Sequence, residues 1–354
     1  MDISQQLQQQ IIDASQSRQA LQIIGNNSKE FYGCAIDIEN TLPLNIAEHS
    51  GVIDYQPSEL TITARAGTPL IEIIELLAEH GQMLAFEPPV FDGKASLGGC
   101  IATALAGPRR PWTGSVRDYV IGTRMLSGDG RDVRFGGKVM KNVAGYDLFR
   151  PMAGALGTLG VMLDITLKLL PKPEHELSFS METDAAEMRT LLREWGYASM
   201  PLSASSYHDE KLSIRLSGSA TSIDAATGKL PSSMQEIATD TWLKINEHKL
   251  PFFEDPAPLY RLLVPANTPC DLIEGESLVD WAGALHWIKT TASLSELQNR
   301  ASGLGGTVSV YRNGLRYDDI FMPLAAPLLA LHKRIKIIMD PMGILNPGRL
   351  YREL

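Results

Sequence analysis

Glycine residues recur between Gly98 and Val161, in a segment that also contains strand-like apolar runs. It opens with Gly98-Gly99-Cys100-Ile101-Ala102-Thr103, continues through Thr113-Gly114-Ser115-Val116-Arg117-Asp118 and closes with Gly154-Ala155-Leu156-Gly157-Thr158-Leu159-Gly160-Val161. Glycine tolerates a positive φ and lets the main chain come within hydrogen-bonding distance of a ligand. Successive backbone N–H groups in such turns form concavities that bind anions. These ordered glycines therefore predict a site for the phosphate groups of a dinucleotide.

A second candidate for phosphate binding lies upstream, in the turn Gly25-Asn26-Asn27-Ser28-Lys29. The turn follows a short apolar strand predicted over residues 21–24. Asn and Gly tolerate a left-handed backbone and Ser supplies a hydroxyl, so the turn can present several N–H groups to an anion. A plain strand-to-helix turn is the alternative, but the position upstream of the glycine-rich segment favours a phosphate site.

The spacing of Gly154, Gly157 and Gly160 invites comparison with the nicotinamide-binding Rossmann fold. In that fold the glycines follow a strand and open a helix, and an acidic residue stands roughly 20 positions further on. Here the glycines precede a strand predicted over residues 161–170, and a proline-rich boundary follows. The sequence therefore argues against a Rossmann domain.

The elements around these turns have the patterns of a protein with both helices and strands. Apolar spacing predicts helices over residues 1–20, 70–80, 294–301 and 327–339. Thr68 is the expected N-cap of the second helix. Apolar runs predict strands over residues 51–55, 60–64, 119–125, 132–135, 161–170, 212–216 and 306–311. The glycine motifs stop near Pro171-Lys172-Pro173, after which we expect a separate α+β unit.

The composition excludes several classes of function. The 354-residue chain is 44% hydrophobic and has a formal net charge of −9, which argues against nucleic acid as a partner because phosphate-backbone binding needs clustered Lys and Arg. Cys34, Cys100 and Cys270 lie far apart, which excludes an iron–sulfur cluster or zinc ribbon held by this chain alone and leaves no disulfide framework. We find no secretory signal and no apolar run of ~18 residues, so we expect a cytoplasmic protein with no membrane span and no metal site.

Several motifs together resemble the flavoproteins with a PCMH-type, vanillyl-alcohol-oxidase-like FAD domain. They are Gly25 to Lys29, Ser96 to Gly99, Gly114 to Asp118, Lys141-Asn142-Val143-Ala144-Gly145-Tyr146-Asp147-Leu148 and Gly157 to Val161. Within that superfamily, the chain is similar over nearly its full length to the FAD-binding subunits of bacterial glycolate oxidases. This narrower resemblance rests on Leu259 to Leu262, Asp280 to Trp287, Tyr311-Arg312 and the tail from Asp340-Pro341 to Leu350.

The resemblance implies an α+β fold in three parts. A PCMH-type FAD-binding domain of two α/β subdomains would occupy residues 1–173. An α+β cap domain would occupy residues 174–326, and a C-terminal segment over residues 327–354 would return to the FAD domain.

The resemblance also implies roles in binding FAD. The candidates for the pyrophosphate are Gly25, Asn26, Asn27, Ser28 and Lys29, together with Gly98, Gly99 and Thr103. The candidates for the rest of the cofactor are Gly107, Gly114 and Ser115 beside the flavin, Gly157, Gly160 and Val161 beside the adenine and ribose, and in addition Pro88, Arg117 and Asp118. Arg117 and Asp118 could equally form an ion pair that braces their loop.

We expect FAD to be bound non-covalently. Histidine or cysteine commonly makes the covalent link in this superfamily, but residues 25–33 contain no histidine. Cys100 follows the double glycine and could approach the cofactor. A buried structural thiol is favoured there, because free cysteine is among the most buried residue types.

Oxidation of a 2-hydroxy acid needs a cation for the carboxylate and a base for the hydroxyl proton, with the Cα–H facing flavin N5. Arg261, Arg312 and Lys141 are the candidate cations, and arginine best suits the bidentate geometry of a carboxylate. Each of them could also be an ordinary surface or interface charge. The cap histidines are well separated in the sequence, unlike the closely spaced histidines of the related catalytic dehydrogenases.

The resemblance implies that the chain works in a heteromeric complex, which its partners would attach to the periphery of the inner membrane. Those partners are a paralogous FAD subunit that oxidises glycolate to glyoxylate and an iron–sulfur subunit that passes electrons onward. Two alternatives stay open. One is a non-catalytic assembly subunit with structural FAD, which exposed Trp242, Trp281 or Trp287 would favour. The other is a stand-alone FAD-dependent alcohol or hydroxy-acid dehydrogenase.

Overall fold

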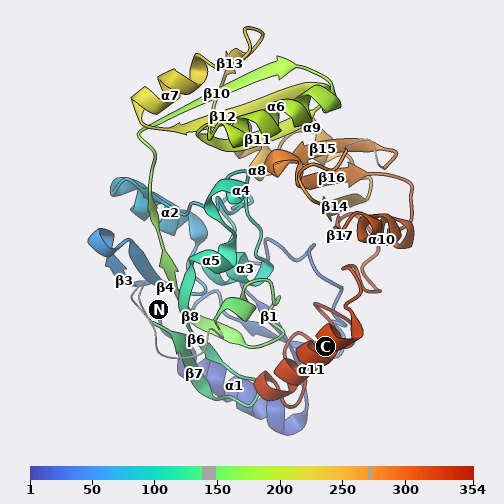
Figure 1. Ribbon diagram of the computed structural model, residues 1–354. Coiled ribbons are helices and arrows are strands. Elements are labelled where there is room, and N and C mark those ends of the chain that lie inside the picture. Colours follow the sequence, from blue (N-terminus) through green and yellow to red (C-terminus); the bar gives the residue numbers. More distant parts are fainter. Residues whose placement is uncertain (138–148, 270–272) are drawn as a thin grey trace. The chain divides into compact units, whose positions relative to one another are not determined.

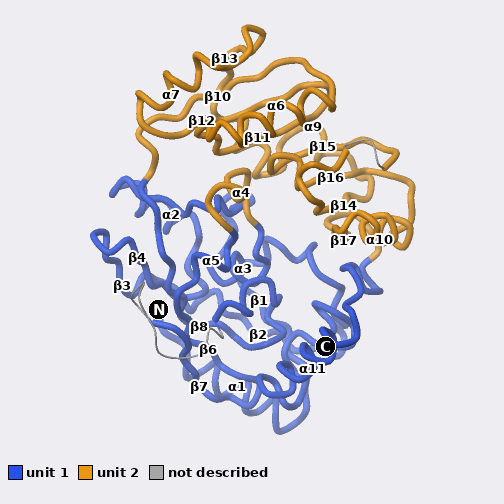
Figure 2. The backbone as a smooth tube through the Cα atoms, viewed as in Figure 1, with its two compact units in different colours: residues 1–105, 115–171, 316–354 blue, residues 106–114, 172–315 orange. Residues whose placement is uncertain are grey.

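The computed structural model describes residues 1–137, 149–269 and 273–354 (Figure 1). Contacts divide the chain into two compact units (Figure 2). Unit 1 combines Met1–Leu105, Ser115–Pro171 and Arg316–Leu354, and unit 2 combines Ala106–Gly114 with Lys172–Leu315. The sequence-based segments 1–173, 174–326 and 327–354 therefore differ from the units in three places. Residues 106–114 and 172–173 belong with unit 2, and residues 316–326 belong with unit 1.

The largest sheet of unit 1 has five antiparallel strands in the order β3-β4-β8-β6-β7. The strands are β3 (Val52–Gln56), β4 (Thr61–Arg65), β6 (Val120–Leu126), β7 (Asp132–Gly136) and β8 (Val161–Lys168). Within the central strand β8, only Asp164 and Lys168 are partly exposed. The continuous apolar run that predicted this strand is typical of a strand covered on both faces.

The rest of unit 1 supplies two short strand pairs and the helices. The pairs are the parallel β1 (Ala20–Ile24) and β2 (Thr41–Asn45), and the antiparallel β5 (Gln82–Met83) and β9 (Leu170–Pro171). The helices are α1 (Ser4–Ser17), α2 (Leu70–Glu79), α3 (Leu97–Thr103), α5 (Val116–Tyr119) and α11 (Ala326–Met339), with the 3-10 turns η1 (Pro57–Glu59) and η2 (Arg150–Met152). The helices predicted near residues 1–20, 70–80 and 327–339 are confirmed.

The prediction that Thr68 caps α2 is wrong. Pro69 occupies the N-cap position, and no side chain caps the helix. The Thr68 hydroxyl instead donates to the Arg65 carbonyl at 2.7 Å and accepts from the Gly51 N–H at 2.9 Å. The side chain is used to close the turn after β4, so it is not available to the helix.

Unit 2 is built on an eight-stranded sheet in the order β13-β10-β12-β11-β15-β16-β14-β17, in which all the pairs are antiparallel. The strands are β10 (His175–Glu182), β11 (Leu202–His208), β12 (Lys211–Gly218), β13 (Gln235–Ile237), β14 (Leu259–Leu263), β15 (Glu276–Asp280), β16 (Leu285–Lys289) and β17 (Thr307–Arg312). The helical segments are α4 (Arg110–Thr113), α6 (Ala185–Tyr197), α7 (Ala220–Thr227), α8 (Thr241–Asn246), α9 (Pro251–Glu254), α10 (Leu294–Gly303) and η3 (Trp281–Gly283). The predicted α+β character is confirmed.

The C-terminal tail lies beside β1. The Leu21 N–H donates to the Ile344 carbonyl at 2.7 Å, and the Asn346 N–H donates to the Leu21 carbonyl at 2.9 Å. Leu21 and Leu345 form a parallel bridge. The last residues of the chain therefore stand next to the turn that follows β1.

Candidate functional site

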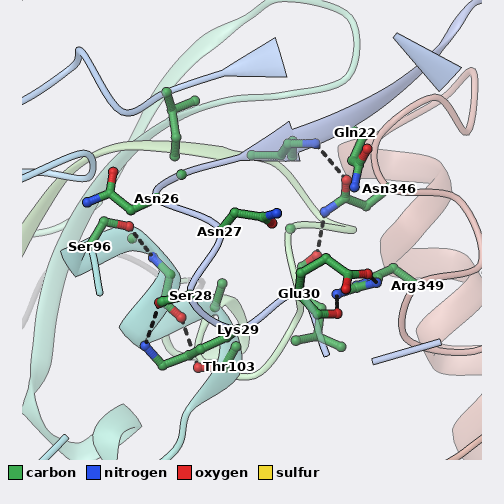
Figure 3. Close-up of a pocket in the computed structure, with 18 of the residues that line it drawn as sticks. Gln22, Asn26, Asn27, Ser28, Lys29, Glu30, Ser96, Thr103, Asn346 and Arg349 are labelled. Atoms are coloured by element: carbon green, nitrogen blue, oxygen red, sulfur yellow. Dashed lines mark hydrogen bonds and ion pairs between the residues drawn. The ribbon is translucent and has the colours of Figure 1, made fainter. Parts of the chain in front are cut away.

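A cleft in unit 1 gathers residues from β1 and its turn, from α3, from the loop before β8 and from the tail (Figure 3). The cleft spans about 800 Å³ of space, which includes open solvent. The predicted cofactor residues that line it are Gly25, Asn26, Asn27, Ser28, Lys29, Gly98, Gly99, Thr103, Gly157 and Gly160. The two glycine-rich regions singled out in the sequence thus meet at one cleft.

The turn after β1 brings a positive charge to this cleft. Asn27 has a φ of +56°, the left-handed conformation that Asn tolerates. Lys29 is only 7% exposed. Its Nζ lies 3.5 Å from the Ser28 Oγ and 5.2 Å from the centre of the Phe91 ring. A largely buried ammonium group at the cleft suits a phosphate, because charge-assisted hydrogen bonds to phosphate are the stronger kind.

Gly25 in the turn and Gly99 in α3 leave the main chain here without side chains. Ser96 is the N-cap of α3 and accepts a hydrogen bond from the Gly99 N–H at 3.3 Å. A Cβ added to Gly25 would lie 2.7 Å from the Ser96 Oγ, and one added to Gly99 would lie 3.2 Å from it. Side chains at either position would fill the space between the turn and α3. The site therefore fits a pyrophosphate, which needs close approach to backbone N–H groups.

The opposite wall is formed by the loop before β8 and by the tail. Gly157 has a φ of +76°, and an added Cβ would lie 2.6 Å from the Asn346 Nδ2. Asn346 Nδ2 donates to the Leu156 carbonyl at 2.6 Å, and its Oδ1 accepts from the Ile23 N–H at 2.8 Å. One amide side chain therefore joins β1, the glycine loop and the tail at the cleft.

A buried ion pair holds the tail behind Asn346. Lys336 Nζ donates to Asp340 Oδ2 at 2.8 Å, to the Thr158 carbonyl at 2.8 Å and to the Leu345 carbonyl at 2.9 Å. Burial lowers the pKa of Lys336, while Asp340 acts to raise it. All three protons of the ammonium group have acceptors, as a buried charge requires. The pair thereby fixes α11 to the loop that lines the cleft.

Arg349 secures the segment that leads away from the phosphate turn. Its guanidinium donates to the carbonyls of Glu30 at 2.7 Å, Tyr32 at 2.7 Å and Cys34 at 2.9 Å. Burial, together with the charge of Arg316, lowers the pKa of Arg349 to about 10. A hydrogen bond from Arg316 lowers the pKa of Glu30. The segment from Glu30 to Cys34 is thus clamped to the tail.

Sequence reasoning missed the functional side chains of the tail and a few neighbours of the turn. These lining residues are Gln22, Ile23, Glu30, Tyr32, Ile36, Ile46, Ser96, Ala102, Leu156, Met162, Asn346 and Arg349. The available signal was the tail motif from Asp340 to Leu350, which carried the family resemblance. It gave no indication of which side chains reach the cleft.

Other predicted cofactor residues lie elsewhere. Pro88 and Val161 are buried and do not line the cleft, and Gly107 and Gly114 belong to unit 2. The Gly107 carbonyl accepts a hydrogen bond from Trp281 Nε1 at 2.9 Å. Their contact with the cofactor stays a prediction.

Ser115, Arg117 and Asp118 form a local structure at α5. The Ser115 N–H and Oγ both donate to Asp118 Oδ2, at 2.8 Å and 2.7 Å, in a capping box. These hydrogen bonds lower the pKa of Asp118. The Arg117 side chain is 70% exposed and its Nε lies 3.9 Å from Asp118 Oδ1. This geometry favours the bracing ion pair over contact with the cofactor.

Cys100 is buried in α3, close to the cleft. It is 1% exposed, and burial raises its pKa to about 12 although the charge of Lys29 opposes the shift. Since the thiolate is the reactive form of cysteine, a thiol with this pKa is a poor nucleophile at neutral pH. The structure thus supports the expectation of a structural thiol.

Two of the predicted substrate cations come together in unit 2. Arg261 on β14 and Arg312 on β17 lie on paired strands, and their charges both act on the buried His248. The His248 ring stacks on Phe253 at 4.1 Å between ring centres, and the Trp287 and Tyr311 rings approach its edge. Burial, then Arg312 and Arg261, lower the pKa of His248 to about 3. Lys141, the third predicted cation, lies outside the described residues.

Arg261 retains hydrogen-bonding capacity. Its Nε is buried and has no hydrogen-bond partner within the described residues. The guanidinium carbon lies 5.2 Å from the centre of the Trp281 ring, and that of Arg110 lies 4.3 Å from the same ring. A guanidinium held on an aromatic ring with a free N–H is suited to a carboxylate.

The tryptophans of unit 2 bear on the alternative of a non-catalytic assembly subunit. Trp242, Trp281 and Trp287 are 3%, 1% and 6% exposed, so they do not supply the exposed aromatics that would favour an assembly role.

Over residues 1–137, 149–269 and 273–354, no group of three or more His, Cys, Asp or Glu side chains is placed to hold a metal ion. In the same residues, no helix is long and apolar enough to cross a membrane.

Comparison with known proteins decides the family. Residues 4–136 match the family model of an FAD binding domain. Glycolate oxidase subunit GlcE of Escherichia coli (strain K12) is 44% identical over 353 residues, which cover 100% of this chain and 99% of that protein. The chain belongs to the GlcE family of glycolate oxidase subunits. It is a flavoprotein, and FAD is its cofactor, as predicted.

More distant relatives agree with this assignment. Glycolate oxidase subunit GlcD of Bacillus subtilis (strain 168) is 36% identical over 137 residues, covering 38% of this chain and 29% of that protein. The solved structure of p-cresol methylhydroxylase with substrate bound matches with a TM-score of 0.75 at 14% identity, covering 99% of this chain and 87% of that chain. This likeness confirms the predicted PCMH-type fold.

Proposed function

We propose that this GlcE-family chain is the FAD-binding subunit of a multisubunit glycolate oxidase. The reaction would convert glycolate, or another small D-2-hydroxy acid, into the 2-oxo acid. The observation that carries the proposal is the 44% identity to a glycolate oxidase subunit over the whole chain. The residues of the cleft and of the Arg261 cluster support it.

The cleft in unit 1 is the proposed cofactor site. The N–H groups of residues 25–29 and the ammonium group of Lys29 would hold the pyrophosphate, which would lie against Gly98, Gly99 and Thr103 of α3. Gly157 and Gly160 would line the adenine and ribose. Because the Cys100 thiol stays protonated at neutral pH, FAD would be held without a covalent bond.

Arg261 and Arg312 are the proposed ligands of the substrate carboxylate. Oxidation removes a hydride from Cα, whose two electrons FAD accepts when it is bound, and releases the hydroxyl proton to a base. The two guanidinium groups would bind the carboxylate and fix the orientation of Cα. The low pKa of His248 keeps its ring uncharged at neutral pH, so it adds no third positive charge to the cluster.

The electrons would leave this chain for other subunits. A four-cysteine cluster site needs more thiolates than the three cysteines of the sequence supply. An iron–sulfur subunit and a paralogous FAD subunit are the partners that would complete the enzyme, with attachment to the inner membrane through them. This arrangement predicts that the isolated chain does not turn over with an artificial electron acceptor at the rate of the complex.

The first test is an absorbance spectrum of the purified chain, before and after anaerobic addition of glycolate or D-lactate. Flavin bands that stay oxidised in the isolated chain and bleach completely in the co-purified complex would support the proposal. Bleaching of the isolated chain would instead indicate a stand-alone dehydrogenase. Because the paralogous subunit carries FAD of its own, a complex in which only the flavin of that subunit bleaches would indicate an assembly subunit with structural FAD.

The substrate cations are tested in the complex. We expect Arg261→Ala and Arg312→Ala each to raise the KM for glycolate at least tenfold while the flavin content is unchanged, since they remove carboxylate contacts. Arg193→Ala, at an exposed position on α6 of the same unit, is the matched control. Unchanged KM values in both variants would remove these residues from the substrate site.

A further inference from the structure

An apolar stripe runs along the exposed side of α11. Leu328, Leu331, Ile335 and Ile338 follow one another at intervals of three, four and three residues. Leu328 is 44% exposed, Leu331 48% and Ile338 65%, while Ile335 is half-buried. Alternating intervals of three and four place apolar side chains on one line of a helix, as in the seam between two packed helices.

Other residues of α11 anchor the helix to unit 1. Lys336 and Met339 are its buried residues, and Lys336 makes the three hydrogen bonds to Asp340, Thr158 and Leu345 described above. Leu328, Leu331 and Ile338 of the stripe are exposed, whereas Ile335 is half-buried and faces other residues of unit 1. Contiguous exposed apolar surface of this kind marks interaction sites in folded proteins.

A pocket adjoins the stripe at Ile335. It is lined by His332, Ile335 and Lys336 of α11 and by residues that include Pro151, Leu159, Leu350 and Leu354. Ile335 belongs to both features, so the stripe and the pocket form one continuous apolar surface, which we call the α11 surface. Its shape offers a line of side chains for a helix to pack on and a hollow for a large apolar side chain.

The charges around the α11 surface distinguish between occupants. The helix contains no acidic residue between Ala326 and Met339. Arg334 is exposed beside the stripe. Arg131, whose side chain is 58% exposed, donates to the Ile338 carbonyl at 3.2 Å but is also ion-paired with Asp129 at 2.7 Å. A partner with acidic groups beside its apolar seam would complement Arg334.

The same charges disfavour two other occupants. A second copy of this chain would bring the same basic residues against each other along the helix. Interfacial helices that bind anionic lipid carry rows of Lys and Arg on the face opposite the apolar one. On α11 that face carries Lys333, which is paired with Glu353, beside the apolar Ile337, so it has no such row. The chain as a whole also has a net charge of −9, which anionic lipid repels.

We propose that the α11 surface binds an amphipathic helix of another subunit of the glycolate oxidase complex, with acidic residues flanking its apolar seam. The inference rests on the proposed function, because it takes the chain to be one subunit of such a complex. It adds the surface through which the complex is joined and the chemistry of the partner segment.

The experiment uses the full chain, tagged and produced together with the other glycolate oxidase subunits of its organism. Leu331→Glu and Ile338→Glu place a carboxylate in the seam and are expected to lower the co-purified subunits at least tenfold. Ile337→Glu is the matched control, because Ile337 is 64% exposed on the same helix but lies outside the stripe. It should retain them. Arg334→Glu should weaken the complex most at low salt.

The readouts separate the possible failures. Flavin content and the tryptophan-reported unfolding midpoint show that each variant is folded, and Leu331→Ser replaces Leu331→Glu if the latter is not. Undiminished co-purification by the folded stripe variants would overturn the inference. The inference would also be overturned if the only effect of the stripe variants were the loss of a homodimer, or the loss of binding to vesicles of anionic phospholipid. A wild-type chain that retains no subunit contradicts the proposed function itself.

Discussion

At the scale of single residues, burial decides which groups near the site can react. Cys100 lies beside the phosphate turn, yet its pKa of about 12 leaves almost no thiolate at neutral pH. We therefore expect acid precipitation of the wild-type protein to release all its flavin into the supernatant. Cys100→Ala should bind FAD with an affinity within about twofold of wild type. Flavin that stays with the wild-type precipitate and is released from Cys100→Ala would show a cysteinyl link instead.

His248 gives unit 2 a defined dependence on pH. Its pKa is about 3 in the folded chain, against an ordinary value of 6.5, so between these values the unfolded chain binds the additional proton. Stability therefore falls as the pH falls from 6.5 towards 3, by at most about 1.4 kcal/mol per pH unit from this group. His248→Phe keeps an aromatic ring against Phe253 and should remove this slope.

Urea unfolding across that pH window, followed by tryptophan fluorescence, measures the effect of His248. All five tryptophans belong to unit 2, and the Trp287 ring centre lies 4.9 Å from that of His248. His175→Gln, at an exposed position on β10, serves as the control. Equal slopes in wild type and His248→Phe would mean that the ring takes up its proton in the folded chain.

At the scale of elements, the cleft depends on contacts between segments that are far apart in the sequence. Asn346 joins the end of β1 to the glycine loop through the Ile23 N–H and the Leu156 carbonyl. Asn346→Ala leaves both groups unsatisfied, at a cost of about 1–3 kcal/mol each. We expect the Kd for FAD to rise at least tenfold while unit 2 is unaffected.

Flavin fluorescence titration of the apoprotein measures the affinity of Asn346→Ala. Asn313→Ala is a matched control, because the Asn313 Nδ2 also donates to two carbonyls, those of Asp255 and Ala257, but in unit 2. An unchanged Kd in Asn346→Ala would show that the tail does not support the cofactor site.

These contacts also explain how much of the site the sequence could predict. The turn at Gly25 and the start of α3 were predictable, because turn and cap chemistry is encoded by neighbouring residues. The role of Asn346 was not, because 323 positions separate it from Ile23 and no periodicity reports such a contact. Thr68 was predicted to cap α2, but its hydroxyl closes the turn after β4. Two local structures compete for this one hydroxyl, and the sequence does not show which of them wins.

In unit 2, too, the sequence did not predict which distant residues the fold brings together, and the predicted cations are an example. Apolar alternation predicted the strand that ends at Tyr311, but not that β14 would pair with both β16 and β17. That pairing is what brings Arg261 and Arg312 to neighbouring strands. Conversely, Gly107 stands only a few residues after α3 in the sequence. Its neighbour Arg109 forms an ion pair with Glu176, and Gly107 itself binds Trp281, so the segment belongs to unit 2.

At the scale of the whole molecule, the two units depend differently on the end of the chain. Unit 1 is assembled from three segments, of which the last is Arg316–Leu354, whereas unit 2 ends at Leu315. A chain that stops after Asp340 keeps every residue of unit 2 and loses residues 341–354. It thereby loses Asn346, Arg349 and the hydrogen bonds of the tail to Leu21.

We expect this truncated chain to lose FAD binding and to retain a cooperative, tryptophan-reported unfolding transition. The cofactor cleft loses one wall, while the eight-stranded sheet of unit 2 and its core around Met188, Trp195 and Ile214 lie wholly upstream. The measurement is a flavin titration together with urea unfolding of the truncated and full-length chains. Loss of both properties would mean that the units fold as one cooperative structure, and retained FAD binding would mean that the tail is dispensable. The expected separation would show that unit 1 completes its cofactor site only when the tail docks beside β1.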